Sequence, residues 1–259
     1  MINPRNNRTV LAVDIGNTTI ALGIVSGLKV AGCWRIETGL ADKTLRQQLR
    51  RRIRFILSKY PGIQEAVVCS VVPRALKIVG DELNQAASLR VRIVGRDINV
   101  PIKNLYRRPK QVGQDRLVCA YAAKTLYGFP SLVIDLGTAI TYDVVSAQGT
   151  YLGGIIVPGI KLSAESLFRK TALLPKIKIQ GPRLLIGKDT KGSILSGLFY
   201  GYGAMSEGLI LQITAKLKKK PVVVLTGGYT KVMKDFIKIR PKILDEGLVF
   251  KGLSLLLSA

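Results

Sequence analysis

One eight-residue pattern occurs twice in this chain, and this repeat constrains the fold more than any other feature. The segment LAVDIGNT covers residues 11–18 and LVIDLGTA covers residues 132–139, so the copies lie 121 residues apart in a chain of 259. In each copy an apolar, strand-like run ends in one carboxylate, Asp14 or Asp135, with a glycine two positions later. The spacing predicts two related halves, each built around one such hairpin.

The residues around each carboxylate indicate phosphate chemistry. A carboxylate at the end of a buried strand needs a cation or hydrogen-bond donors, because desolvating it costs several kcal/mol. The glycine permits a tight turn and a close approach of ligand to backbone. Side chains that can donate follow both glycines: Asn17, Thr18, Thr19, Thr138 and Thr141. This set suits phosphate oxygens and a hydrated metal ion. The alternative for either copy is an Asp-x-Gly turn without a ligand.

Composition describes a globular protein of a reducing compartment. Hydrophobic residues make up 47% of the chain and charged residues 22%, which excludes disorder. No apolar stretch reaches the roughly 18 residues of a membrane span, and the polar residues 1–9 do not resemble a secretory signal. Cys33, Cys69 and Cys119 have no metal-ligand spacing, so we expect small buried residues. We therefore expect a cytoplasmic protein.

The chain contains no histidine, and this limits its chemistry. Histidine-ligated zinc sites and histidine-based catalytic triads are excluded. A carboxylate or a perturbed lysine is left as a general base. Four acids are candidates: Asp14, Asp135 and Asp143, which stand between apolar or aromatic residues, and Asp115, which stands between Gln114 and Arg116.

The net charge of +24 indicates an affinity for anions. Basic runs cover residues 50–54, 107–110 and 216–220. They could bind nucleic acid, or they could form a solvated surface that attracts small anionic substrates. The runs themselves contain no aromatic residue for base stacking, so we favour the solvated surface and expect no nucleic-acid partner.

Periodicity predicts the same order of elements in both halves. In the first half we expect strands at 9–14, 19–26, 28–36, 65–72 and 91–94, with helices at 40–58, 74–88 and 114–127. In the second half we expect strands at 132–135, 139–145, 150–157 and 221–225, with helices at 161–170, 193–217, 230–238 and 252–257. This order predicts two α/β domains, residues 1–125 and 126–259, that share an interface and a cleft.

An ordered series of motifs resembles one known family. The motifs are DIGNT at 14–18, YRRPKQVGQDR at 106–116, DLGTAITYD at 135–143, GGIIVPG at 153–159, GKDT at 187–190 and GLVFKGL at 247–253. They resemble the acetate kinase, sugar kinase and actin superfamily, and within it the type III pantothenate kinases. The resemblance covers nearly the whole chain after residue 9. It implies two ribonuclease-H-like (actin-like ATPase) domains related by internal duplication, with a cleft between them. One departure is Cys119, where the family often has asparagine.

The resemblance also implies an activity. It is the transfer of the γ-phosphoryl group of ATP to pantothenate, which gives 4'-phosphopantothenate in the first step of coenzyme A biosynthesis. Asp115 would be the general base. ATP would be bound by Asp14, Ile15, Gly16, Asn17, Thr18, Thr19, Ile20, Ala21 and Thr138. Pantothenate would be bound by Tyr106, Gly113, Gln114, Asp115, Arg116 and Thr190. Asp14 would hold Mg²⁺ through water, and Asp135 a monovalent cation, K⁺ or NH4⁺. A homodimer that does not associate with membranes is also implied.

Several residues keep a second interpretation. Asp135 could be a second ligand to magnesium-bound water, and Asp115 with Arg116 could form an ion pair at a helix start. Thr190 could cap the following helix, and Tyr106 could be an exposed loop aromatic.

The nucleotide site and the activity also have two interpretations each. The Thr226-Gly227-Gly228 segment could admit a nucleotide base or ribose, or could be an ordinary turn. The chain as a whole could phosphorylate another small hydroxyl compound, or be a catalytically inactive regulatory or nucleic-acid-associated homologue.

Overall fold

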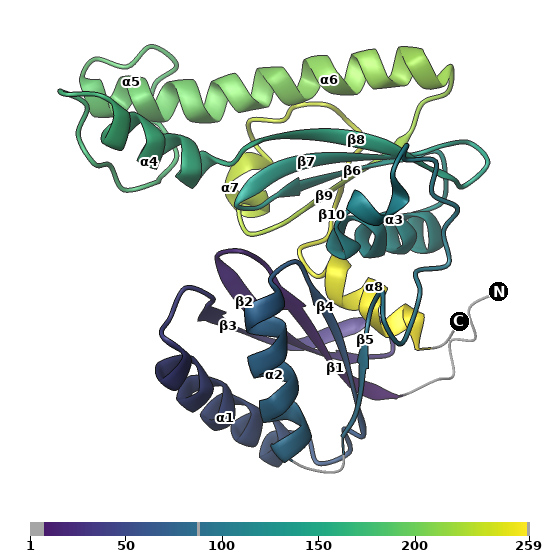
Figure 1. The fold of residues 1–259 in the computed structure, drawn as a ribbon. Coiled ribbons are helices and arrows are strands. Elements are labelled where there is room, and N and C mark those ends of the chain that lie inside the picture. Colours follow the sequence, from purple (N-terminus) through teal and green to yellow (C-terminus); the bar gives the residue numbers. More distant parts are fainter. Residues whose placement is uncertain (1–7, 87–88, 258–259) are drawn as a thin grey trace. The chain divides into compact units, whose positions relative to one another are not determined.

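The computed structural model describes residues 8–86 and 89–257, which form two compact units (Figure 1). Unit 1 combines the chain up to Ile102 with Arg107–Ala122 and the chain from Gly247 onward. Unit 2 combines Lys103–Tyr106 with Ala123–Glu246. Each unit contains one five-stranded sheet with helices, which confirms the predicted α/β class with two related halves. The domain limits at 1–125 and 126–259 stay a prediction.

The sheet of unit 1 begins with the predicted meander. Its strand order is β3-β2-β1-β4-β5, made of β1 (Thr9–Ile15), β2 (Thr19–Ser26), β3 (Lys29–Glu37), β4 (Glu65–Ser70) and β5 (Arg90–Ile93). The first three strands are antiparallel neighbours, and β4 and β5 run parallel to β1. Parallel pairing requires a crossover, and the helices between these strands supply it.

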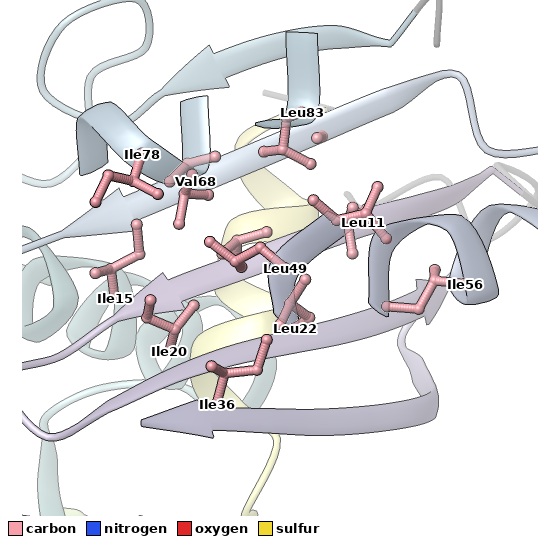
Figure 2. Close-up of a cluster of buried hydrophobic side chains, with 14 of the residues drawn as sticks. Leu11, Ile15, Ile20, Leu22, Ile36, Leu49, Ile56, Val68, Ile78 and Leu83 are labelled. Atoms are coloured by element: carbon pink, nitrogen blue, oxygen red, sulfur yellow. The ribbon is translucent and has the colours of Figure 1, made fainter. Parts of the chain in front are cut away.

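Two helices, α1 (Asp42–Lys59) and α2 (Pro73–Ala86), cover one face of this sheet. The buried residues of α1 recur every three or four positions: Leu45, Leu49, Ile53 and Ile56. They pack against Leu11, Leu22 and Val68 of the sheet and Ile78 of α2 in a core that excludes water (Figure 2). Complete burial of such a side chain is worth about 1.5–3 kcal/mol. The predicted helix at 74–88 is confirmed up to Ala86; residues 87 and 88 lie outside the described residues.

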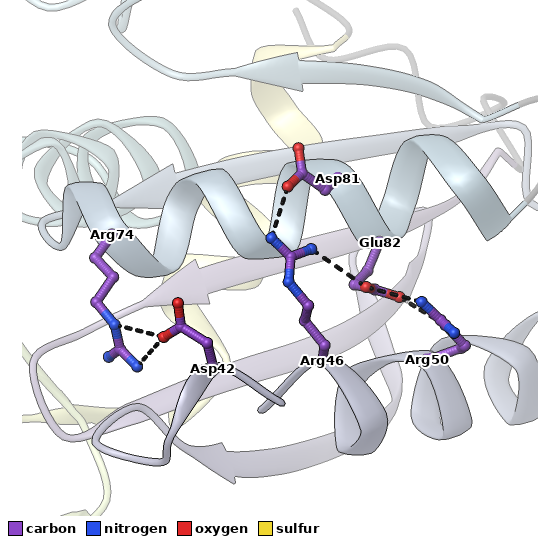
Figure 3. Close-up of polar contacts among 6 residues, drawn as sticks. All are labelled: Asp42, Arg46, Arg50, Arg74, Asp81 and Glu82. Atoms are coloured by element: carbon purple, nitrogen blue, oxygen red, sulfur yellow. Dashed lines mark hydrogen bonds and ion pairs between the residues drawn. The ribbon is translucent and has the colours of Figure 1, made fainter. Parts of the chain in front are cut away.

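Charged side chains join the same two helices (Figure 3). Arg46 of α1 lies 2.9 Å from Asp81 of α2, and Arg50 lies 3.0 Å from Glu82. Glu82 is only 2% exposed and also contacts Arg46 at 3.4 Å. Asp42 pairs with Arg74 near the other end of α2. Part of the basic run at 50–54 therefore neutralises buried acid.

The opposite face of the first sheet is covered by α3 (Gln114–Tyr127) and α8 (Leu248–Leu256). Phe250, Leu253 and Leu256 of α8 pack with Val10 and Ala12 of β1. The helix predicted at 252–257 therefore begins earlier, at Leu248, and belongs to unit 1 although it follows all of unit 2 in sequence.

The sheet of unit 2 repeats the topology of the first. Its order is β10-β9-β6-β7-β8, made of β6 (Ser131–Leu136), β7 (Ala139–Val145), β8 (Tyr151–Pro158), β9 (Val222–Thr226) and β10 (Ile243–Leu244). The strands β6, β7 and β8 are antiparallel, and β9 is parallel to both β6 and β10. Both copies of the repeated pattern thus occupy the central strand of a sheet, as the duplication predicts.

The helices of unit 2 differ from the prediction in detail. They are α4 (Ile160–Lys170), α5 (Thr190–Ser196), α6 (Tyr202–Leu217) and α7 (Thr230–Met233). The single helix predicted at 193–217 is interrupted by a π-helical turn over Gly197–Gly201, and that predicted at 230–238 ends at Met233. Across residues 8–86 and 89–257, no helix combines the length and apolarity of a membrane span.

Candidate functional site

The turn of the first hairpin is held by a hydrogen bond within the turn and by two hydrogen bonds from Thr38. Asp14 is the penultimate residue of β1, and the turn after it is closed by a hydrogen bond from the Gly16 N–H to the Thr19 carbonyl at 3.0 Å. Thr38 follows β3 and donates its hydroxyl to the Gly16 carbonyl at 2.8 Å. Its N–H also donates to the Thr18 carbonyl at 3.0 Å. The role of Thr38 could not be predicted, because no local motif links this residue to a turn 22 residues earlier.

Side chains of the predicted ATP segment differ widely in exposure. Ile15 and Ile20 are 0% exposed and lie in the core between the sheet and α1 and α2. Only their backbone could therefore contact a phosphate. Asn17 is exposed, and Thr18 and Thr19 are half-buried, so the tip of the turn carries the donors.

Two carboxylates of unit 1 lie near one buried thiol. Asp14 stands beside Cys69 in the parallel pairing of β1 with β4. The pKa of Cys69 is raised well above its usual value, mainly by burial and further by the negative charges of Asp14 and Asp115. Asp14 and Asp115 are therefore both close to Cys69 within unit 1.

Asp115 lies in the first turn of α3, beside a glycine. Its Oδ1 accepts the Arg116 N–H at 2.9 Å. A side chain at Gly113 would overlap that same oxygen, so only glycine allows the carboxylate to lie there. Gln114 packs over Gly95, whose φ of +83° favours glycine. This geometry is compatible with both a base and a helix-start role for Asp115.

The second hairpin places Asp135 between two threonines. Antiparallel pairing sets Asp135 opposite Thr141 of β7, and parallel pairing sets it beside Thr226 of β9. Gly227 follows with φ of +92°, and a side chain there would overlap the Asp135 carboxylate. The Thr226-Gly227-Gly228 segment therefore packs directly on Asp135, and its role toward a nucleotide stays a prediction.

Backbone contacts hold the second turn. The Gly137 N–H donates to the Ala139 carbonyl at 3.1 Å, and the Gly159 N–H to the Thr138 carbonyl at 3.0 Å. A side chain at Gly159 would strike the carbonyls of Gly137 and Thr138. Thr138 is an exposed residue at the tip of this turn.

The predicted pantothenate residues are divided between the units. Tyr106 belongs to unit 2, whereas Gly113, Gln114, Asp115 and Arg116 belong to unit 1. The Tyr106 N–H donates to Asn104 Oδ1 at 2.9 Å, and its ring lies against Gly153.

Thr190 is also in unit 2, where it is exposed at the start of α5. The alternative that Thr190 caps this helix is wrong. The N-cap is Asp189, whose carboxylate accepts the Gly192 N–H at 2.6 Å.

The oxygen atoms of Asp14 and Asp135 suit hard cations whose other ligands are water or substrate phosphate. Across residues 8–86 and 89–257, no group of three or more His, Cys, Asp or Glu could enclose a metal ion. Magnesium commonly uses one or two carboxylates together with waters and substrate phosphates, which suits Asp14. Asp135 with its flanking hydroxyls suits a monovalent cation or hydrated magnesium equally well.

Comparison with known proteins agrees with this geometry. The family model described as type III pantothenate kinase matches residues 10–212. A type III pantothenate kinase from Acidothermus cellulolyticus is 38% identical, covering 95% of this chain and 97% of that protein. A crystal structure of a protein from Campylobacter jejuni, described as a Baf family transcriptional activator, matches with a TM-score of 0.60 and 18% identity over 96% of this chain and 97% of that one.

A sugar kinase extends the likeness of the fold. The ROK family glucokinase from Streptomyces griseus matches with a TM-score of 0.55 and 11% identity over 97% of this chain and 100% of that one. At such identities the solved structures show the fold alone, while the family model and the curated relative show the family. The chain belongs to the type III pantothenate kinase family.

Proposed function

We propose that this protein transfers the γ-phosphoryl group of ATP to the primary hydroxyl of pantothenate, the first step of coenzyme A biosynthesis. The observation that carries the proposal is the family match across residues 10–212, which spans both acid-and-glycine hairpins. Phosphoryl transfer depends on positioning and charge stabilisation more than on covalent chemistry, and the two hairpins supply carboxylates and donors of that kind.

The first hairpin is proposed to bind the ATP phosphates. The backbone of residues 14–21 and the side chains of Asn17, Thr18 and Thr19 would donate to phosphate oxygens. Asp14 would hold Mg²⁺ through water, and the ion would neutralise charge on the phosphates. Thr138 of the second hairpin would contribute its exposed hydroxyl to the same nucleotide.

Asp115 is proposed as the general base. Its carboxylate would accept the proton of the pantothenate hydroxyl as that oxygen attacks phosphorus. Gly113 leaves room beside the carboxylate, and the Arg116 guanidinium offers a planar fork for developing charge. Gln114, Tyr106 and Thr190 would complete the pantothenate site.

Asp135 is proposed to bind a monovalent cation, K⁺ or NH4⁺, with magnesium-bound water as the alternative ligand. The flanking Thr141 and Thr226 support a site made of hard oxygen atoms. The two alternatives differ in their dependence on salt, because only the first predicts activation by K⁺ or NH4⁺ at constant ionic strength.

A second copy of this chain is the proposed macromolecular partner. The edge strand β8 exposes Ile156 at 59%, and the following helix α4 exposes Leu162 at 46% and Phe168 at 43%. Exposed apolar side chains on a sheet edge and on the helix that follows it are candidates for an interface. Ile156→Glu should shift the sedimentation coefficient of the protein from dimer to monomer, and an unchanged coefficient would remove this face from the interface.

One assay tests the activity. ADP release should depend on pantothenate and should be negligible with a panel of other small hydroxyl compounds. Repeating it with potassium, ammonium or a bulky organic cation at equal ionic strength tests the monovalent site. Pantothenate-independent ADP release, or a better substrate in the panel, would overturn the assignment of substrate.

A further inference from the structure

Unit 2 contains a buried carboxylate that the proposed function does not use. Asp143 lies in β7 and is only 1% exposed. A charged carboxylate at this depth persists only where hydrogen bonds replace its water. Its surroundings therefore reveal what it serves.

Two hydroxyl groups bind the two oxygen atoms of Asp143. Thr141 Oγ1 donates to Asp143 Oδ2 at 2.8 Å, and the Tyr151 hydroxyl donates to Asp143 Oδ1 at 2.7 Å. Hydrogen bonds to an ionised acceptor are short and roughly twice as strong as neutral ones. Asp143 thus fixes the direction of both hydroxyl groups.

The first hydroxyl lies next to the proposed cation site. Thr141 is directly opposite Asp135 across the β6–β7 pair, where Cβ atoms are about 4.5–5.5 Å apart. Because the Thr141 hydrogen points to Asp143, its oxygen turns lone pairs toward its other neighbours. A hydroxyl that donates to Asp143 keeps its oxygen lone pairs for a cation, and the strand pairing sets Thr141 beside Asp135.

The second hydroxyl belongs to the residue that holds the Tyr106 segment. The Tyr151 N–H donates to the Lys103 carbonyl at 2.8 Å, and the Leu105 N–H donates to the Tyr151 carbonyl at 2.9 Å. Tyr106 comes next, and its ring lies against Gly153 of the same strand β8. Anchoring Tyr151 therefore anchors the proposed pantothenate residue.

We propose that Asp143 is a positioning residue that couples the cation site at Asp135 to the pantothenate site at Tyr106, acting through Thr141 and Tyr151. The inference rests on the proposed function for the roles of Asp135 and Tyr106. The coupling itself lies wholly within unit 2 and consists of hydrogen bonds and strand pairing.

A neighbouring hydrogen bond provides a matched control. Tyr142 lies on the opposite face of β7, is fully buried, and its hydroxyl is 2.8 Å from Ser206 Oγ. Tyr142→Phe removes a buried hydroxyl contact of similar length from the same strand. It should lower the melting temperature without altering either site, as a merely structural role would.

The experiment compares Asp143→Asn, Thr141→Val, Tyr151→Phe and Tyr142→Phe in the full chain. One readout is the KCl concentration that gives half-maximal turnover. A second measures cation binding without catalysis: it is the rise of the melting temperature in KCl compared with that in choline chloride. The other readouts are KM and the calorimetric Kd for pantothenate. We expect Thr141→Val to lower the affinity for K⁺ about 10-fold and Tyr151→Phe to lower the affinity for pantothenate about 10-fold. Asp143→Asn should lower both affinities.

The pattern decides the inference. Unchanged constants in Asp143→Asn, or equal changes in Tyr142→Phe, would reduce Asp143 to a structural residue. If Asp143→Asn does not fold, the separate losses in Thr141→Val and Tyr151→Phe still test the coupling. If the wild-type protein binds pantothenate but does not phosphorylate it, the proposed function is overturned and the coupling is not. The melting and calorimetric readouts would still test the coupling, because they do not require turnover.

Discussion

The two hairpins that open the two sheets differ by one residue in their turns. Ile15 pairs with Ile20 across a turn of four residues, whereas Leu136 pairs with Ile140 across a turn of three. Side chains alternate between the faces of a strand, so register decides which residues correspond. In register, Gly23 of unit 1 corresponds to Asp143 of unit 2, since their partners are Ala12 and Val133.

The corresponding positions perform opposite tasks. Gly23 leaves room for the ring of Phe250, so α8 closes this face of the first sheet with apolar packing. Asp143 instead binds the hydroxyls of Thr141 and Tyr151. The comparison teaches that one topology, used twice, gives a closed apolar face in one copy and a polar network beside a site residue in the other.

The largest expected effect tests whether unit 1 supplies the base. Asp115→Asn should lower kcat by roughly 10²–10⁴-fold, because the amide cannot take the proton of the attacking hydroxyl. Steady-state kinetics with ATP and pantothenate measure this. Asp235→Asn, at an exposed position of unit 2, is the control and should leave kcat unchanged. Near-normal turnover of Asp115→Asn would remove that residue from the base role.

The next effect sharpens the difference between the residues at the ends of β4 and β9. Ser70 lies beside Ile15 in unit 1, but Gly227 follows Thr226 and lies against Asp135 in unit 2. Gly227→Ala should reduce kcat/KM by about 10²-fold, the effect of a displacement of about 1 Å at a site. Gly128→Ala is the matched control, since Gly128 has a similar φ of +90° and its added methyl group meets no atom within 4 Å. Equal activity in the two variants would contradict the packing on Asp135.

A smaller effect tests the apolar face of unit 1. A Cβ at Gly23 would lie 2.6 Å from a ring carbon of Phe250, so Gly23→Ala should lower the free energy of unfolding by about 1–3 kcal/mol. Urea titration measures this, and adding Phe250→Leu should restore part of the loss. Gly80→Ala, in α2 with open space around it, should instead stabilise the fold by up to about 1 kcal/mol. A Gly23→Ala protein of unchanged stability would show that α8 can shift freely.

The smallest effect compares two ways of burying a carboxylate. Glu82 is paired with arginines whose side chains are 35% and 50% exposed, so Glu82→Gln should destabilise the fold by only about 1 kcal/mol. High salt should shrink that difference, because it screens the partly exposed guanidinium groups. In choline chloride, which does not occupy the proposed cation site, the melting-temperature difference between Asp143→Asn and wild type should change less than that of Glu82→Gln, because hydroxyl groups donate to both oxygen atoms of Asp143. An equal response to salt in both variants would contradict the difference between a carboxylate held by arginines and one held by hydroxyl groups.

Local patterns predicted most of the fold. The apolar runs ending in Asp14 and Asp135 gave the central strands, and the glycines after them marked the hairpins. The one-residue difference between the turns was not predictable. The two copies of the motif keep the same spacing of 121 residues as far as Thr18 and Ala139, so the sequence shows no insertion there. The difference lies in the strand register, which depends on hydrogen bonding. The interruption of the helix at Gly197–Gly201 also depends on tertiary packing.

Non-local contacts limited prediction of the site. The motif at 106–116 is continuous in sequence, yet the Tyr106 ring lies against Gly153 of β8 in unit 2, whereas Asp115 is in the first turn of α3 in unit 1. Thr38 closes the first turn from a distant position that no spacing rule identifies. The motif was sufficient to propose roles for the residues within it. The residues that support them from elsewhere in the chain can be identified only once the pairing of the strands is known.

The position of α8 has a consequence for how the protein is made. During translation, β1 and β2 emerge first, but the ring of Phe250 and its neighbours reach them only after all of unit 2 has been synthesised. Until then the part of this face that α8 covers beside α3 remains apolar and exposed, a surface that chaperones bind and that favours aggregation. We expect the ribosome-bound first half to stay protease-sensitive until residues 248–256 leave the exit tunnel.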